Sequence, residues 1–155
     1  MRALIVCVVL VLAACAKAPD SSPEAPAERR ASTGAWLGTV RSAHAAADAA
    51  NTLELRQQAL AALRVLASGN VPEAIVPDEA ASLRRDLYAH AVRLALDLKY
   101  LQLAESLTSD GLALEGNDPF RTQLLILAAE TYRALGHAEA EAKALALARQ
   151  DLGLD

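Results

Sequence analysis

Cysteine and histidine are the residues of this sequence whose side chains could act as nucleophiles or metal ligands. The two cysteines, Cys7 and Cys15, lie close to the N-terminus, and the three histidines, His44, His90 and His137, fall on different predicted helices or turns. None of these histidines has the close carboxylate or second histidine that a local metal-binding motif requires. We therefore expect no metal site, and surface or half-buried positions for the three histidines.

Serine, glycine and the acidic residues offer no catalytic motif either. No serine lies in a nucleophile elbow, and no glycine-rich loop precedes a helix in phosphate-binding form. Glu139 and Glu141 are two residues apart on a predicted helix, so their carboxylates point away from each other and cannot form an acid and base pair. We expect a protein that is not an enzyme and that uses no metal or cofactor.

The first fourteen residues have the pattern of a secretion signal. Met1-Arg2 gives a short positive start, and residues 3–14 (ALIVCVVLVLAA) form an unbroken apolar run of twelve residues that ends in small side chains. A helix that spans a bilayer needs about 20 apolar residues, so this run is too short to cross a membrane. We predict that residues 1–14 are a signal peptide.

The end of this run carries a more specific pattern. The four residues Leu12-Ala13-Ala14-Cys15 resemble the lipobox of bacterial lipoproteins at all four positions. The resemblance implies that the Cys15 thiol accepts a diacylglycerol group, that the bond before Cys15 is cut, and that the new amino terminus receives an acyl chain such as palmitate. The alternative is an ordinary secretory signal in which a cysteine falls at this position by chance.

Stable membrane attachment follows from this lipidation. Several acyl chains on one residue exceed the two signals that stable anchoring requires. Cleavage would remove Cys7 and the lipid would consume the Cys15 thiol, so we expect no free thiol in the mature chain. Ala16 follows Cys15, whereas aspartate is the residue that retains lipoproteins at the inner membrane. The resemblance therefore implies a protein on the inner leaflet of the outer membrane that faces the periplasm.

Residues 15–34 comprise the lipidated cysteine and a predicted flexible linker. The segment Ala16–Gly34 contains three prolines, three serines and almost no large apolar residue. Such a composition cannot bury enough apolar surface to offset the entropy cost of ordering. We expect a tether between the lipid and the rest of the chain.

We predict that residues 35–155 form one all-α domain of about six helices in three antiparallel hairpins. Apolar residues recur at helical spacing from Trp36 onward, with breaks at Ser68-Gly69-Asn70, at Val71–Pro77, at Gly116–Pro119 and at Gly136. Asp78 and Asp118 are the predicted N-caps of the third and fifth helices, and Pro119 suits a first helical turn. The fourth helix is expected at Leu101–Leu114 and the sixth at Ala138–Leu152.

The second and third hairpins look like two copies of one unit at an offset of 37 residues. The residues Leu125, Ala128-Ala129, Tyr132 and Gly136 are spaced as in a tetratricopeptide repeat, and the chain from Phe120 to Leu152 resembles that family. The middle copy departs from the pattern at Lys99-Tyr100 and at Gly111. The resemblance implies a short solenoid of stacked hairpins, and the alternative is a plain helical bundle.

The first helix of each hairpin would line a concave face of such a solenoid. After the core positions are removed, the residues that share this face are Ala89, Arg93, Leu96, Ile126, Glu130 and Arg133. An exposed apolar strip flanked by arginines would suit a protein segment that has apolar and acidic groups. The alternative is that Leu96 and Ile126 complete the core between hairpins.

These features favour a membrane-anchored protein-interaction module, an adaptor or scaffold for another cell-envelope protein. A second hypothesis is a structural envelope lipoprotein that associates with itself through the outer edge of the last hairpin, at Ala142, Leu145, Leu147 and Leu152. A third is a carrier of a small hydrophobic ligand, which would need a pocket of several hundred cubic ångströms. The formal net charge of −4, without a basic run, argues against a nucleic-acid partner.

Overall fold

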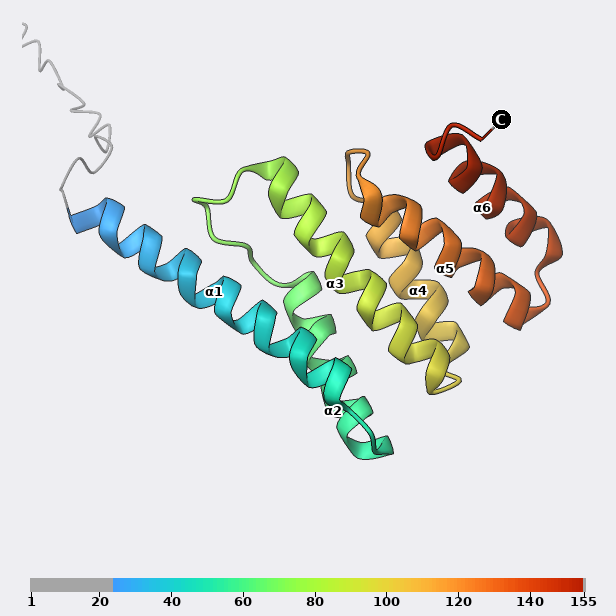
Figure 1. Cartoon of the computed structure of the whole chain (residues 1–155), viewed down its shortest axis with the longest axis horizontal. Helices are drawn as coiled ribbons and strands as arrows, with labels where there is room; N and C mark the ends of the chain where they lie inside the picture. Colours follow the sequence, from blue (N-terminus) through green and yellow to red (C-terminus); the bar gives the residue numbers. More distant parts are fainter. Residues whose placement is uncertain (1–23, 155) are drawn as a thin grey trace, which may run out of the picture.

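The computed structural model describes residues 24–154, and this part of the chain is all-helical, with six helices and no strand (Figure 1). The predicted all-α class and number of helices are therefore confirmed for these residues. The proposed signal peptide, Cys15 and the start of the linker lie outside the described residues. The helices are α1 (Glu24–Ala49), α2 (Leu53–Ser68), α3 (Pro77–Asp97), α4 (Leu101–Leu112), α5 (Pro119–Leu135) and α6 (Ala138–Asp151).

The ends of α5 follow the sequence prediction. The Asp118 side chain accepts hydrogen bonds from the backbone N–H of Phe120 at 2.9 Å and of Arg121 at 3.1 Å, with Pro119 in the first turn. Gly136 ends the helix in the left-handed region, at φ 78°, where a side chain would be strained.

The predicted start of α3 is wrong by two residues. Val76 is the N-cap and Pro77 occupies the first turn, which places Asp78 inside the helix rather than at its cap. The fixed φ of proline suits the first helical turn, where its missing N–H costs no hydrogen bond. Asp78 and Glu79 still favour this end through the helix dipole.

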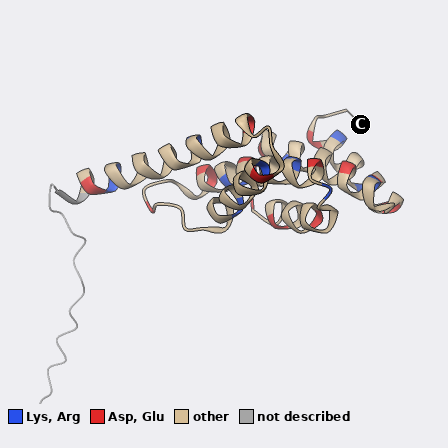
Figure 2. Ribbon diagram, turned by 90° about the horizontal axis from the view of Figure 1, so that it is seen from below, with Lys and Arg blue, Asp and Glu red and all other residues tan. Residues whose placement is uncertain are grey.

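Helix α1 begins earlier than the sequence predicted. Residues 24–34 are helical, although they were expected to belong to the flexible linker. Alanine, glutamate and arginine in residues 27–31 have high helix propensity, and Pro26 lies in the first turn, where its missing N–H costs nothing. The first turns of α1 project beyond the other helices (Figures 1 and 2), and residues 27–32 are exposed.

Helix α3 lies at the centre of the arrangement. It contacts α1, α2, α4 and α5, whereas α6 contacts α5 alone. The helices α1, α3 and α5 lie in one row, with α2 and α4 behind them (Figure 1). Buried residues therefore extend around much of the α3 circumference: Arg85, Leu87, Tyr88, Ala89, Ala91, Val92, Leu94 and Ala95.

Small residues let these helices approach closely. Gly111 is buried in α4, and a Cβ atom built on it would lie 2.7 Å from Leu124 Cδ1 and 3.0 Å from Tyr88 Cβ. Real Cβ atoms almost never come that close to another carbon, so glycine is the residue that fits between α3 and α5 at this point. The glycine that breaks the repeat pattern therefore has a packing role.

The surface of the described helices is mixed in charge. Lysine and arginine are interspersed with aspartate and glutamate along the ribbons (Figure 2).

None of the helices in residues 24–154 combines the length and the apolar character needed to span a bilayer.

Candidate functional site

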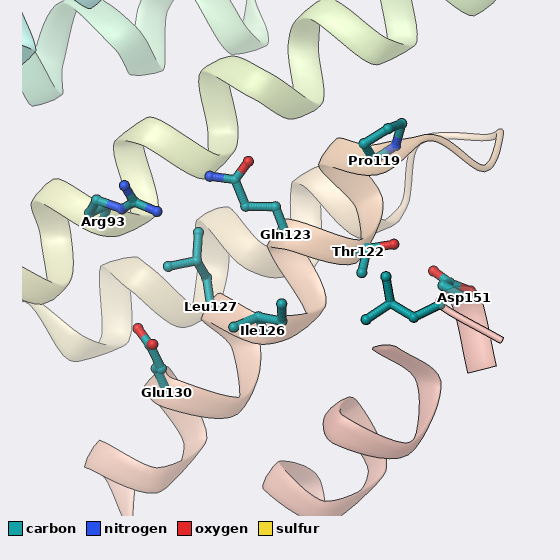
Figure 3. Close-up of a pocket in the computed structure, with 9 residues that line it drawn as sticks. Arg93, Pro119, Thr122, Gln123, Ile126, Leu127, Glu130 and Asp151 are labelled. Carbon is teal, nitrogen blue, oxygen red and sulfur yellow. The ribbon is translucent and has the colours of Figure 1, made fainter. Parts of the chain in front are cut away.

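A surface groove of about 650 Å³ lies beside α5, between α3 and the end of α6 (Figure 3). It includes three of the six residues predicted for partner binding: Arg93, Ile126 and Glu130. Its lining residues are Arg93, Pro119, Thr122, Gln123, Ile126, Leu127, Glu130, Asp151 and Leu152.

The middle of the groove is apolar. Leu127 is buried, whereas Ile126 keeps 43% of its surface exposed and Leu152 keeps 56%. Figure 3 shows Ile126 and Leu127 between Arg93 and Glu130 on one side and Asp151 on the other. An apolar side chain that covered this strip would remove the exposed surface of Ile126 and Leu152 from water, at a gain of about 25 cal/mol per Å².

Two charged side chains at one end of the groove are available to a ligand. Arg93 and Glu130 are exposed, and neither forms an ion pair or side-chain hydrogen bond with another residue in 24–154. Asp151 is different, because it pairs with Arg121 and so holds the end of α6 against α5. The groove therefore offers one cation and one anion whose charges are not already neutralised by a partner.

Three of the predicted partner-binding residues lie elsewhere. Ala89 is fully buried, so its assignment to an exposed face is wrong, because α3 is covered by helices on several sides. Leu96 is half-buried against the core, as the alternative interpretation had it. Arg133 is turned toward α6, where its Nε lies 2.8 Å from Glu141 Oε1.

Sequence reasoning missed part of the groove. Thr122 and Gln123 stand four and three residues before Ile126, a spacing that places them on the same helix face and could have revealed them. Asp151 and Leu152 lie at the C-terminal end of α6, and no local pattern in the sequence signals that this end meets α5.

A second cluster of polar side chains lies where α1 meets α3. His44 Nε2 of α1 is 3.4 Å from Asp86 Oδ2, and His90 Nδ1 is 3.3 Å from Asp86 Oδ1. The two imidazole rings meet edge to face, with centroids 4.2 Å apart. The expectation that these histidines lack a nearby carboxylate and a second histidine is therefore wrong.

The electrostatics of the two histidines differ. Burial lowers the pKa of His44, and the neighbouring His90 lowers it further, against the opposing effect of Asp86 and Asp48. The hydrogen bond with Asp86 raises the pKa of His90, although burial acts against it. His44 Nε2 is shielded from solvent and has no hydrogen-bond partner, since its contact with Asp86 does not have hydrogen-bond geometry.

The third histidine stands apart from this cluster. His137 precedes α6, its side chain is 52% exposed, and its nearest carboxylate is Glu105 at 3.9 Å.

Comparison with known proteins finds no matching protein-family model, curated protein or solved structure.

Proposed function

We propose that this chain is a membrane-anchored protein-interaction module of the cell envelope, whose groove beside α5 binds a segment of another envelope protein. The observation that carries the proposal is the exposed apolar strip of Ile126 and Leu152 next to the unpaired Arg93 and Glu130. Exposed apolar surface rimmed by polar and charged residues is typical of protein-interaction and ligand-binding sites.

The order of helix contacts supports a solenoid of three stacked hairpins. Helix α3 contacts both α1 and α5, while α2 packs between α1 and α3, and α4 between α3 and α5. This is the contact order expected when hairpins α1–α2, α3–α4 and α5–α6 stack as in tetratricopeptide repeats. In that arrangement the groove lies on the side of the first helices, as the resemblance implied.

The chemistry of the groove points to a peptide segment as its occupant. A large apolar side chain would cover Ile126 and Leu127, and an acidic group beside it would pair with Arg93. The volume is large enough to reconsider a small hydrophobic ligand, but five lining residues are exposed: Arg93, Pro119, Ile126, Glu130 and Leu152. An open surface of this kind favours a protein segment over an enclosed small molecule.

The proposal places lipid on Cys15 and the domain on the periplasmic side of the outer membrane. Because α1 begins at Glu24, eight residues lie between Cys15 and the first residue of α1. The nine Cα–Cα steps from Cys15 to Glu24 reach at most roughly 30 Å, about half the distance that the longer linker would have allowed. The 26-residue α1, roughly 39 Å long, would then determine how far the groove lies from the membrane.

Site-specific photo-crosslinking of the full-length chain in its native envelope tests the groove. A photoreactive residue at position 126 should capture one protein, and Ile126→Asp or Arg93→Glu should abolish or strongly reduce recovery of that protein in a pull-down. The matched control is Val65→Asp, because Val65 is 70% exposed on α2 and does not line the groove. Full recovery with Ile126→Asp would place the binding site elsewhere.

The lipid anchor needs its own test. Cys15→Ser should leave the chain unprocessed or release it from the membrane fraction, because serine cannot accept the thioether-linked lipid. A membrane fraction unchanged by this substitution, with the same processed mass, would contradict the lipoprotein proposal.

Self-association is the second candidate, and the outer surface of α6 supports it. Ala142, Leu145 and Leu152 are exposed, and Leu154 beyond the helix keeps 60% of its surface exposed, whereas Leu147 is half-buried. No further helix of the described chain covers this surface. A photoreactive residue at position 145 that captured only a second copy would favour this candidate.

A further inference from the structure

His44, Asp86 and His90 form a constellation of metal-ligand atoms that joins two helices. Asp86 and His90 are four residues apart on α3, so they share one face, and His44 reaches them from α1. One ligand atom from each side chain lies within 4.8 Å of those of the other two. Two imidazoles and one carboxylate are a ligand set that Zn²⁺ commonly takes.

The ligand atoms lie within 4.8 Å of one another, somewhat farther apart than a tetrahedral ion requires, so the side chains would close around it. Zn–N and Zn–O bonds of about 2.0–2.1 Å place neighbouring ligand atoms of a tetrahedron about 3.3 Å apart. His44 Nε2 lies 3.4 Å from Asp86 Oδ2, and His90 Nδ1 lies 3.3 Å from Asp86 Oδ1, so the two contacts use different oxygens of one carboxylate. His90 Nδ1 also lies 3.1 Å from the backbone carbonyl of Asp86, and an ion bound to this nitrogen would replace the proton of that hydrogen bond. His44 Nε2 also has no hydrogen-bond partner and is shielded from solvent, which leaves a buried lone pair or N–H unsatisfied.

We propose that His44, Asp86 and His90 bind a divalent transition-metal ion, Zn²⁺ in the first place, which clamps α1 onto α3. Three protein ligands leave one tetrahedral position for water. Asp48, one turn along α1 from His44, borders the same hollow as His90 and adds negative charge nearby. None of the three ligands lines the groove beside α5.

The ion would strengthen the contact between α1 and α3. The contact between α1 and α3 is direct but less extensive than those of α3 with α2, α4 and α5. Helix α1 also follows the N-terminal segment that carries Cys15. A metal bridge between His44 and His90 would therefore fasten the helix nearest the proposed anchor to the central helix of the domain.

Zinc titration of the full-length chain in nonionic detergent tests the site. The chain carries no polyhistidine tag, and Cys7 and Cys15 are changed to alanine so that no thiol competes for the ion. Calorimetry should detect one Zn²⁺ per chain, and Tm should rise by roughly 5–10 °C when zinc is about 100-fold above its Kd. A cobalt titration should give the intense visible absorption of tetrahedral Co²⁺.

Single variants assign the ligands. His44→Gln, Asp86→Asn and His90→Gln should each weaken zinc binding at least about 10-fold, which is the loss that even an outer-shell partner can cause. Each shift in Tm is measured against the zinc-free form of the same variant, so a general loss of stability does not imitate a lost ligand.

The third histidine provides the matched control. His137→Ala removes an exposed imidazole outside the cluster and should leave the zinc response unchanged. Absence of stoichiometric binding by the parent chain, or equal binding by the parent and the three ligand variants, would overturn the proposal and leave a metal-free ion-pair cluster.

Discussion

Arg85 is a buried charged residue whose replacement should measurably destabilise the fold. Its side chain is 1% exposed, and its guanidinium pairs with Asp118 and donates hydrogen bonds to the backbone carbonyls of Leu114 and Glu115. Those three acceptors belong to the turn between α4 and α5. Arg85 therefore ties α3 to the segment that starts the last hairpin.

The cost of Arg85→Met follows from what the substitution leaves behind. Removing one partner of a buried ion pair typically costs about 3–5 kcal/mol, because the other groups stay buried without compensation. Asp118 and Leu114 are half-buried and Glu115 is exposed, so water can replace part of the lost bonding. We therefore expect the lower end, about 3 kcal/mol, and a decrease in Tm of roughly 10 °C.

Thermal unfolding followed by circular dichroism measures this effect, with Arg84→Met as the matched control. Arg84 is the neighbouring residue, but it donates a single hydrogen bond, to the Gly69 carbonyl at 2.7 Å. Its replacement should cost about 1 kcal/mol. Equal decreases in Tm for the two variants would refute the reasoning, since burial and the three-acceptor network of Arg85 would then have no energetic consequence.

Three further predictions concern the core. Gly111→Ala should destabilise by about 1–3 kcal/mol through overpacking against Leu124, although alanine has the higher helix propensity. A raised Tm would contradict the close approach of α4 to α3 and α5. Leu124→Asp should lower Tm by more than any surface variant, because it places an unpaired charge at a fully buried position; a near-native Tm would show that Leu124 is not in the core. Burial and the nearby Asp110 raise the pKa of Tyr88, so its contribution to stability is complete below about pH 10 and is lost as the pH rises toward the folded-state pKa. Tyr88→Phe should therefore reduce the loss of Tm above about pH 10, and an unchanged alkaline profile would remove Tyr88 as the cause.

Local sequence signals predicted the parts of the fold that depend on neighbouring residues. Asp118 and Gly136 mark the ends of α5 because their requirements, a side-chain acceptor and a positive φ, are met within one helical turn. The start of α1 was missed because prolines and serines of the N-terminal segment outweighed the helix propensity of residues 27–31.

The parts of the fold that could not be predicted depend on distant contacts. Ala89 was assigned to a free face because amphipathic spacing assumes one covered side, whereas α3 contacts four other helices. The buried Arg85 has no local signal either, since its partners lie about thirty residues further along the chain. For the histidine cluster, the spacing of Asp86 and His90 was visible in the sequence, but the arrival of His44 depends on how α1 is placed against α3.

Helix α3 links the two candidate sites through residues one turn apart. His90 faces α1, and Arg93, three residues later, lines both the groove beside α5 and a smaller hollow that includes His90 and Asp48. Residues three apart on a helix lie close to one face, so an ion that fixed His90 against α1 would also restrict the orientation from which Arg93 reaches the groove. The two proposals can nevertheless be tested separately. Ile126→Asp disrupts the apolar strip without changing a metal ligand, and His90→Gln removes a ligand without altering Ile126 or Glu130.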